Sequence, residues 1–98
     1  MLYAIGLDLA SPEDNGPRIE QWLARNFGYQ IRVLPQLWIA EGSLAAEQIR
    51  TGLEPLLGED DRLVVIKTAR EAVTHGLPED VVRWVRERFP DSLTERIP

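Results

Sequence analysis

Few side chains in this chain of 98 residues combine the type and the spacing that chemistry requires. The single histidine, His75, could serve as a general base, but a lone loop histidine without an identifiable partner is more often a solvated residue. The acidic run 59–61 could bind a cation, yet it lacks the alternating ligand spacing of a calcium-binding loop. We therefore expect a solvated loop at His75 and a solvated turn at 59–61.

Basic side chains near the C-terminus are a second candidate for a contact with a ligand. The segment 79–89 carries three arginines that could contact phosphate, and Glu87 among them dilutes their charge. These arginines are Arg83, Arg86 and Arg88. A solvated helix face is the favoured interpretation of this pattern.

The three tryptophans could stack on nucleic-acid bases if they were exposed. Trp22 falls in an apolar stripe of helical spacing, which predicts a position in the core. Trp38 alternates with Leu37 and Ile39, and we expect it on the open side of a sheet, where it would help to form a dimer. Trp84 is expected to be the most exposed of the three.

Composition excludes several classes of site. The absence of cysteine excludes disulfides, a thiolate zinc site and a cysteine nucleophile, and it fits a reducing cytoplasm, where we expect the protein. The formal net charge of −5 argues against a non-specific nucleic-acid binder, although a local basic patch or bridging metal ions would still allow such contact. The apolar run 1–9 lacks a basic flank, so we expect neither a signal peptide nor a membrane span.

The first apolar segment, residues 2–9, is predicted to be a strand because its residues alternate with a period of two. One face is apolar and suits a core; it carries Tyr3, Ile5, Leu7 and Leu9. The other face is small in its middle and ends in a carboxylate; it carries Leu2, Ala4, Gly6 and Asp8. On the residues alone, Asp8 is expected to cap the loop 10–16 that follows.

The remaining elements follow from apolar periodicity and from the prolines. Pro17 is expected at the first position of a helix, and Pro35 interrupts a strand because it cannot donate a ladder hydrogen bond. Ser43 is the expected N-cap of the next helix, whose last turn Pro55 should shorten. The expected elements are strands over 2–9 and 62–67, two strands within 29–41 on either side of Pro35, and helices over 17–27 and 43–57.

This order of elements predicts a single α+β domain over 1–98. Its core, 1–68, is expected to be a ferredoxin-like βαββαβ two-layer sandwich. The remainder, 69–98, is predicted to add a helix that begins at Pro78, followed by a tail. The residues from 93 onward are left as either a short edge strand or a free end.

Two features of the strands point to a second copy of the chain. Residues 63–66 form a continuous apolar run, which is typical of a strand buried on both faces. In a two-layer domain the helices cover only one face of the sheet, so a second protomer is the simplest cover for the other. The small residues beside Asp8 suggest close packing on that same face. We therefore expect a homodimer.

Several of these residues also match a family pattern. They are Leu7-Asp8-Leu9 at the end of the first strand, Gln36-Leu37-Trp38-Ile39, and the run Asp60-Asp61-Arg62-Leu63-Val64-Val65. With them, the segment 1–68 resembles the ferredoxin-like superfamily of the second CRISPR-associated Cas protein, VapD-type toxins and SinR-family proteins. The likeness is greatest to the SinR-family pattern.

The resemblance implies a role for Asp8. In this superfamily two protomers pair through their sheets, and an aspartate at the end of strand one lies near the dimer axis. In members that are metal-dependent nucleases, this position holds Mg²⁺ or Mn²⁺, so the resemblance makes Asp8 a metal ligand and catalytic residue. One carboxylate from each protomer could bind a hard cation that activates water or stabilises charge on a phosphate.

The resemblance thus implies a dimeric protein of nucleic-acid metabolism or defence, and, if it is an enzyme, a metal-dependent endonuclease acting on RNA or DNA. The alternative is a non-catalytic dimerisation or adaptor domain that binds a protein partner, with the third helix as one available surface. The acidic net charge supports the alternative modestly, and both remain open on the sequence.

Overall fold

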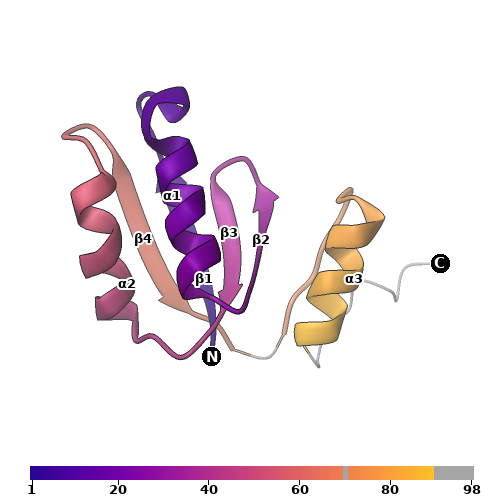
Figure 1. Ribbon diagram of the computed structural model, residues 1–98. Helices are drawn as coiled ribbons and strands as arrows, with labels where there is room; N and C mark the ends of the chain where they lie inside the picture. Colours follow the sequence, from indigo (N-terminus) through magenta and orange to yellow (C-terminus); the bar gives the residue numbers. More distant parts are fainter. Residues whose placement is uncertain (70, 90–98) are drawn as a thin grey trace. The chain divides into compact units, whose positions relative to one another are not determined.

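The computed structural model describes residues 1–69 and 71–89, and the chain divides into two compact units, Met1–Thr68 and Ala69–Pro98. Figure 1 shows their helices and strands. The first unit contains β1 (Leu2–Asp8), α1 (Pro12–Asn26), β2 (Tyr29–Leu34), β3 (Leu37–Glu41), α2 (Ala46–Leu53), a 3-10 turn η1 (Glu54–Leu56) and β4 (Arg62–Lys67). The second unit contains α3 (Glu79–Arg88).

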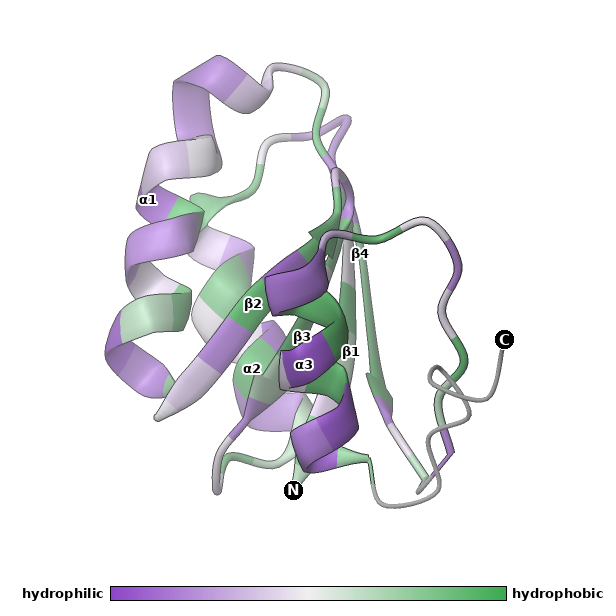
Figure 2. Cartoon of the chain, turned by 90° about the vertical axis from the view of Figure 1, so that its right-hand side faces the viewer, coloured by the Kyte–Doolittle hydropathy of each residue, from purple (hydrophilic) through white to green (hydrophobic). Residues whose placement is uncertain are grey.

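The first unit is built on a sheet of four strands in the order β2-β3-β1-β4, and every neighbouring pair is antiparallel. Both α1 and α2 lie on the same side of this sheet, which leaves its other face without a helix from residues 1–68 (Figure 2). The unit therefore has two layers and an α+β architecture, as the order of elements predicted.

The core lies between the sheet and the two helices, and β1 is its central strand. Tyr3, Ile5 and Leu7 are buried against α1 and α2, whereas Ala4 and Gly6 are only partly covered. The predicted alternation of β1 is thus confirmed. The core consists of Tyr3, Ile5, Leu7, Ile19, Leu23, Phe27, Trp38, Ala40, Ile49 and Leu53.

The start of α1 differs from the prediction. The helix begins at Pro12, with Ser11 as its N-cap residue, and Pro17 lies inside it instead of at its first position. A proline at the first position and two acidic residues in the first turn favour this earlier start. Proline has no N–H that would be left unpaired there, and the acidic side chains interact favourably with the free N–H groups of the first turn. The shift brings Asn15, which was expected in a loop, into the helix.

The boundaries of α2 are set by one glutamine and one proline. The helix begins later than expected from Ser43, because the N–H of Ala45 donates to Oε1 of Gln48 at 2.8 Å and makes Ala45 the N-cap residue. Pro55 shortens the helix as predicted, and the chain continues there as η1.

Pro35 separates β2 from β3, as predicted, and the two strands form a hairpin whose register shifts between Arg32 and Leu34. The expected exposure of Trp38 on the open face is wrong. Trp38 is opposite Ile5 in the register, faces the helices and is only 4% exposed. The guanidinium carbon of Arg32 lies 4.7 Å from the centre of its ring.

In the second unit, α3 begins directly after Pro78, as predicted. Val81, Val85 and Phe89 are buried, and Trp84 is partly exposed, with the guanidinium carbon of Arg88 at 4.3 Å from the centre of its ring. The predicted tail from 93 onward lies outside the described residues. None of the described helices is long and apolar enough to cross a membrane.

Two glycines in the helices provide a test of this packing. Trp22, expected in the core, is partly buried and rests on Gly52, where an added Cβ would lie 2.8 Å from Cε2 of the indole. Around Gly16, in α1, an added Cβ would meet nothing within 4 Å. We expect Gly52→Ala to lower the free energy of unfolding by about 1–2 kcal/mol, because overpacking outweighs the gain in helix propensity.

The comparison variant is Gly16→Ala, which should change the free energy of unfolding less than Gly52→Ala does, because the gain in helix propensity is offset by crowding between the added Cβ and the ring of Pro17, the next residue. Urea denaturation of both variants measures the difference. Equal effects of the two substitutions would contradict the contact between Trp22 and Gly52.

Candidate functional site

Asp8 stands at the end of β1, on the sheet face that α1 and α2 do not cover. The side chain is exposed, and Nε2 of Gln36 donates to its Oδ1 at 3.4 Å. Arg62, at the start of β4, is its cross-strand neighbour. These three residues and Gly6 border a shallow depression of about 250 Å³, so the structure brings one carboxylate, one amide and one cation together.

The residues around Asp8 are a poor match for a preformed metal site. Asp8 is the one carboxylate that lines the depression, and Arg62 adds a positive charge beside it. Among the described residues, no group of three or more His, Cys, Asp or Glu side chains is placed to hold a metal ion. A single protomer therefore offers one carboxylate to a cation, and further ligands would have to come from water, substrate or a second protomer.

The loop after β1 is capped by a different carboxylate from the one expected. The N–H of Ala10 donates to Oδ1 of Asp61 at 2.8 Å, where the sequence had suggested a cap from Asp8. The N–H of Gly58 donates to Oδ2 of Asp61 at 2.7 Å, and Nδ2 of Asn15 donates to the same oxygen at 2.8 Å. Asp61 thus links the β1–α1 loop, α1 and the turn before β4 through hydrogen bonds.

Asn15 completes this network from the interior. Its side chain is 8% exposed, and Nδ2 also donates to the main-chain oxygen of Leu56 at 3.0 Å. Because a buried amide is costly unless it is hydrogen-bonded, the two acceptors account for its position. The network borders a second depression, of about 370 Å³.

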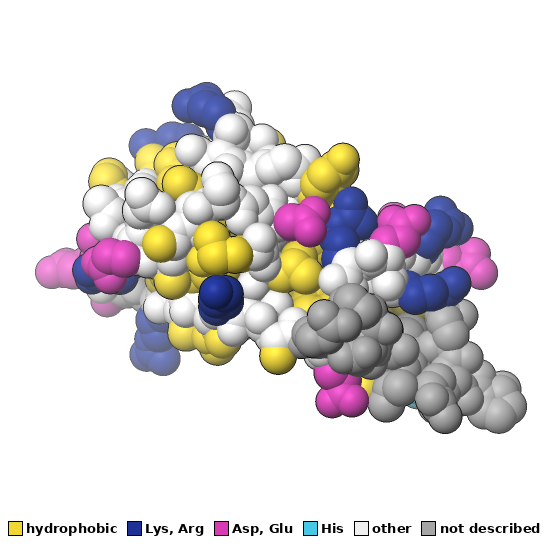
Figure 3. Space-filling model, turned by 90° about the horizontal axis from the view of Figure 1, so that it is seen from below, with side chains coloured by type: hydrophobic (Ala, Val, Ile, Leu, Met, Phe, Trp, Pro, Cys, Tyr) yellow, Lys and Arg dark blue, Asp and Glu magenta, His cyan; other side chains and the backbone are white. Residues whose placement is uncertain are grey.

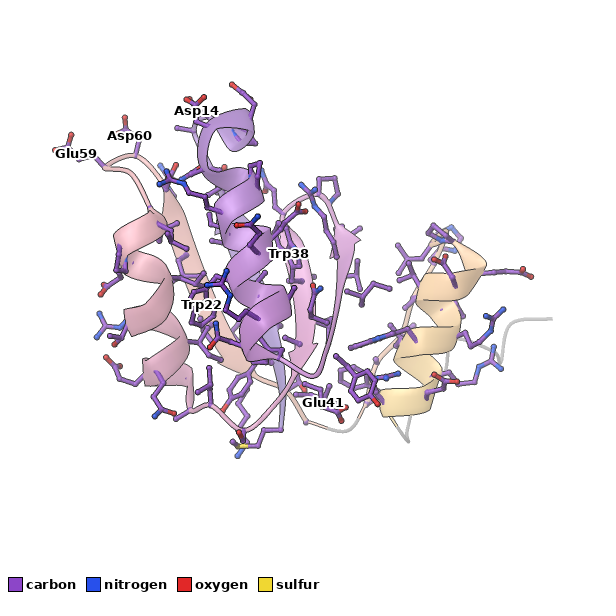
Figure 4. The ribbon with its side chains drawn as sticks, viewed as in Figure 1. Asp14, Trp22, Trp38, Glu41, Glu59 and Asp60 are labelled. Atoms are coloured by element: carbon purple, nitrogen blue, oxygen red, sulfur yellow. The ribbon has the colours of Figure 1, made fainter. Side chains whose placement is uncertain are left out.

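The three acidic residues of the turn 59–61 therefore have different roles. Glu59 and Asp60 are exposed, and Figure 4 shows them and Asp14 pointing away from the body of the unit at one end. For Glu59 and Asp60 the predicted solvated turn is confirmed, but for Asp61 it is wrong. The hydrogen bonds from Ala10, Gly58 and Asn15 hold the pKa of Asp61 below its ordinary value of 3.8.

A third depression, of about 540 Å³, lies between α1 and the edge strand β2. Glu20 and Arg32 form an ion pair of 3.6 Å across it, above the ring of Trp38. Both side chains are about half exposed, so the pair contributes little to stability. The one carboxylate among its lining residues, that of Glu20, is paired with Arg32, and the depression carries no further candidate site.

The remaining predicted candidates are dispersed. His75 is exposed in a bend of the second unit, as expected for a solvated loop residue. Arg83 and Arg86 are exposed on α3, whereas Arg88 is partly covered. In the surface view of Figure 3, acidic and basic side chains alternate with small apolar groups, and no broad patch of one sign is visible among the described residues.

Comparison of the chain with protein-family models, with curated proteins and with solved structures gave no match.

The network of Asn15 and Asp61 is the main polar feature that the sequence analysis missed. Its partners are 46 residues apart in the chain, so no local motif joins them. One signal was available: Ser-Pro-Glu-Asp over 11–14 is typical of a helix start, and it would have placed Asn15 inside a helix.

The pKa of Asp61 leads to a pH-dependent expectation. Because its folded-state pKa is lowered, its contribution to stability is fully present above the pKa of the unfolded carboxyl and is lost as pH falls through the folded value. Asp61→Asn should therefore unfold at a lower temperature than the natural chain at pH 7, and the gap should shrink below pH 3.8. Thermal unfolding followed by circular dichroism across this range measures it.

Asp60→Asn is the matched control, since the residue is an exposed neighbour in the same turn. It should unfold like the natural chain at pH 7, because the Asp60 side chain is exposed. A constant gap for Asp61→Asn across the titration would contradict the role of the ionised carboxylate.

Proposed function

We propose that the chain is a homodimerisation module with a ferredoxin-like core, and that two copies pair through the sheet face that α1 and α2 leave uncovered. The antiparallel order β2-β3-β1-β4, with both helices on one side, supports the ferredoxin-like assignment. The resemblance of residues 1–68 to the superfamily of the second CRISPR-associated Cas protein and SinR-family proteins supports pairing through sheets.

The observation that carries the proposal is the exposure of two large apolar side chains on that face. Val64 is 51% exposed and Ile66 is 55% exposed, although both lie in the middle of a regular strand. Their cross-strand neighbours on β1 are Gly6 and Ala4, which add no polar group. Apolar residues gathered on one sheet face are typical of an interaction surface.

A second copy is the favoured occupant because the face carries charges of both signs at one end. Asp8 and Arg62 are adjacent and exposed there, so the surface can complement itself. The formal net charge of −5 gives less support to a nucleic-acid backbone as the primary partner.

A metal-dependent nuclease is the second candidate function, and the position of Asp8 favours it. Asp8 is exposed on the same face as Val64, so pairing of two sheets would bring a carboxylate from each protomer to the interface. Together with water and phosphate oxygens, such carboxylates could hold Mg²⁺ or Mn²⁺. An adaptor that binds another protein through this face is the non-catalytic alternative.

The dimer can be tested with a charge placed on the apolar strand. Sedimentation equilibrium of the natural chain at micromolar concentration should give twice the mass of 11.1 kDa. Val64→Lys should weaken dimerisation by at least about tenfold, because a lysine would have to be buried in the interface. Thr51→Lys, at an exposed position of α2, adds the same charge and should leave the dimer intact.

A natural chain that sediments as a monomer over this range would refute the dimer. Equal weakening by Val64→Lys and Thr51→Lys would instead indicate an effect of net charge and would place the interface elsewhere.

If the protein is a nuclease, Asp8 is expected to be required for cleavage. If the chain cleaves single-stranded RNA or double-stranded DNA with Mg²⁺ or Mn²⁺, Asp8→Asn should reduce cleavage by about a hundredfold or more, because the amide is a poor replacement for an anionic ligand. Asp60→Asn is the control and should keep full activity. Gel-based cleavage assays measure both.

Absence of metal-dependent cleavage by the natural chain, or equal cleavage by the natural chain and Asp8→Asn, would remove Asp8 as a catalytic residue.

A further inference from the structure

The outer face of the β1–β4 ladder is built from three cross-strand pairs, and the two residues of each pair differ in size or in charge. Ala4 is opposite Ile66 and Gly6 is opposite Val64, so two pairs combine a small residue with a large apolar one. The third pair combines the carboxylate of Asp8 with the guanidinium of Arg62. In every pair the small or acidic member belongs to β1 and the large or basic member to β4.

This arrangement makes the ladder complementary to its own copy under one particular symmetry. A two-fold axis that runs parallel to the strands, midway between β1 and β4, lays β1 of one protomer over β4 of the other. Each large side chain then faces a small one, and each carboxylate faces an arginine. Face-to-face sheets keep their strands within about 30° of each other, so the match can hold over three pairs.

We propose that the protomers pair about this axis, with Asp8 of each protomer against the partner's Arg62 and Val64 of each against the partner's Gly6. The inference rests on the proposed dimer and adds its axis and its contacts. The depression of about 250 Å³ beside Gly6 and Val64 leaves room for the partner's side chain at this point.

Other axes bring together residues that match less well. A parallel axis through β1 itself would place the two Asp8 carboxylates against each other. An axis perpendicular to the strands through Gly6 would place Arg62 against the partner's Ile66, which would bury a charge on an apolar residue. The proposed axis avoids both the repulsion between the two carboxylates and the burial of the Arg62 charge against an apolar residue.

The arrangement assigns Asp8 a role in positioning the protomers. Its carboxylate would be neutralised by the partner's Arg62, and a shared cation would not be needed to bring the two protomers together. Addition of Mg²⁺ or of a chelator should then leave the dimer dissociation constant unchanged, whereas a metal shared by two Asp8 carboxylates would tighten the dimer.

The test uses the two opposite charge reversals, Asp8→Arg and Arg62→Asp, in separate chains. Each variant alone should dimerise at least about tenfold more weakly than the natural chain, because like charges then meet in both of the symmetry-related contacts between positions 8 and 62. An equimolar mixture should form heterodimers, since Arg at position 8 of one chain faces Asp at position 62 of the other. Native mass spectrometry of chains with different tags reads out the composition.

The outcomes separate the axis from the dimer. A monomeric natural chain refutes the proposed function and this inference together. A dimeric natural chain whose variants dimerise normally, or whose mixture forms no excess of heterodimer, overturns the axis and leaves the dimer standing. Should either reversal unfold the chain, Gly6→Leu provides the second test: it should weaken the dimer at least about tenfold by filling the position that the partner's Val64 needs.

A Gly6→Leu variant that is folded and dimerises like the natural chain would also overturn the proposed axis. Because an added Cβ at Gly6 would lie 2.9 Å from Cγ1 of Val64 in its own chain, the thermal stability of the variant is measured alongside.

Discussion

The register of β1 is the constraint on which the rest of the first unit depends. This strand is paired on both of its edges, with β3 and with β4, so its alternation fixes which side chains of three strands face α1 and α2. Tyr3, Ile5 and Leu7 enter the core, and Ala4, Gly6 and Asp8 are left on the other side. A slip by one residue would exchange the two sets, exposing the core residues and burying Asp8.

A second, polar constraint fixes the loops at one end of this core. Asp61 and Asn15 join the start of α1 to the turn before β4 through hydrogen bonds of 2.7–3.0 Å. The apolar core sets how the helices lie on the sheet, and this network sets where two of the connecting loops begin and end. The opposite face of the sheet depends on neither, and Val64 and Ile66 are exposed there.

The sequence was sufficient for the elements whose signals are local. The alternation of β1, the apolar run of β4 and the interruptions at Pro35 and Pro55 were all predicted, because periodicity and proline act within a few residues. The face of Trp38 was not, since it depends on how the hairpin pairs with β1 and on the register shift after Arg32. The earlier start of α1 was missed because the prediction placed Pro17 at the first helical position, although Pro12 followed by two acidic residues is the stronger signal of a helix start.

The candidate site shows the same division. The face on which Asp8 lies followed from alternation, whereas its neighbours Gln36 and Arg62 come from distant segments and could be placed only by the sheet pairing. The role of Asp61 depends on a contact with Ala10, 51 residues away in the chain, which no periodicity encodes.

The central position of β1 also determines the order in which this unit can fold. Leu2 pairs with Glu41 and Tyr3 pairs with Lys67, so the strand nearest the N-terminus gains its two neighbours only after most of the unit has been synthesised. Closing such long loops is slow because chain entropy is lost before the contacts form. During synthesis on the ribosome, β1 would therefore have both edges unpaired until β3 and β4 have emerged. The small residues and the carboxylate of Asp8 on its outer face would help to prevent association with other chains in that interval.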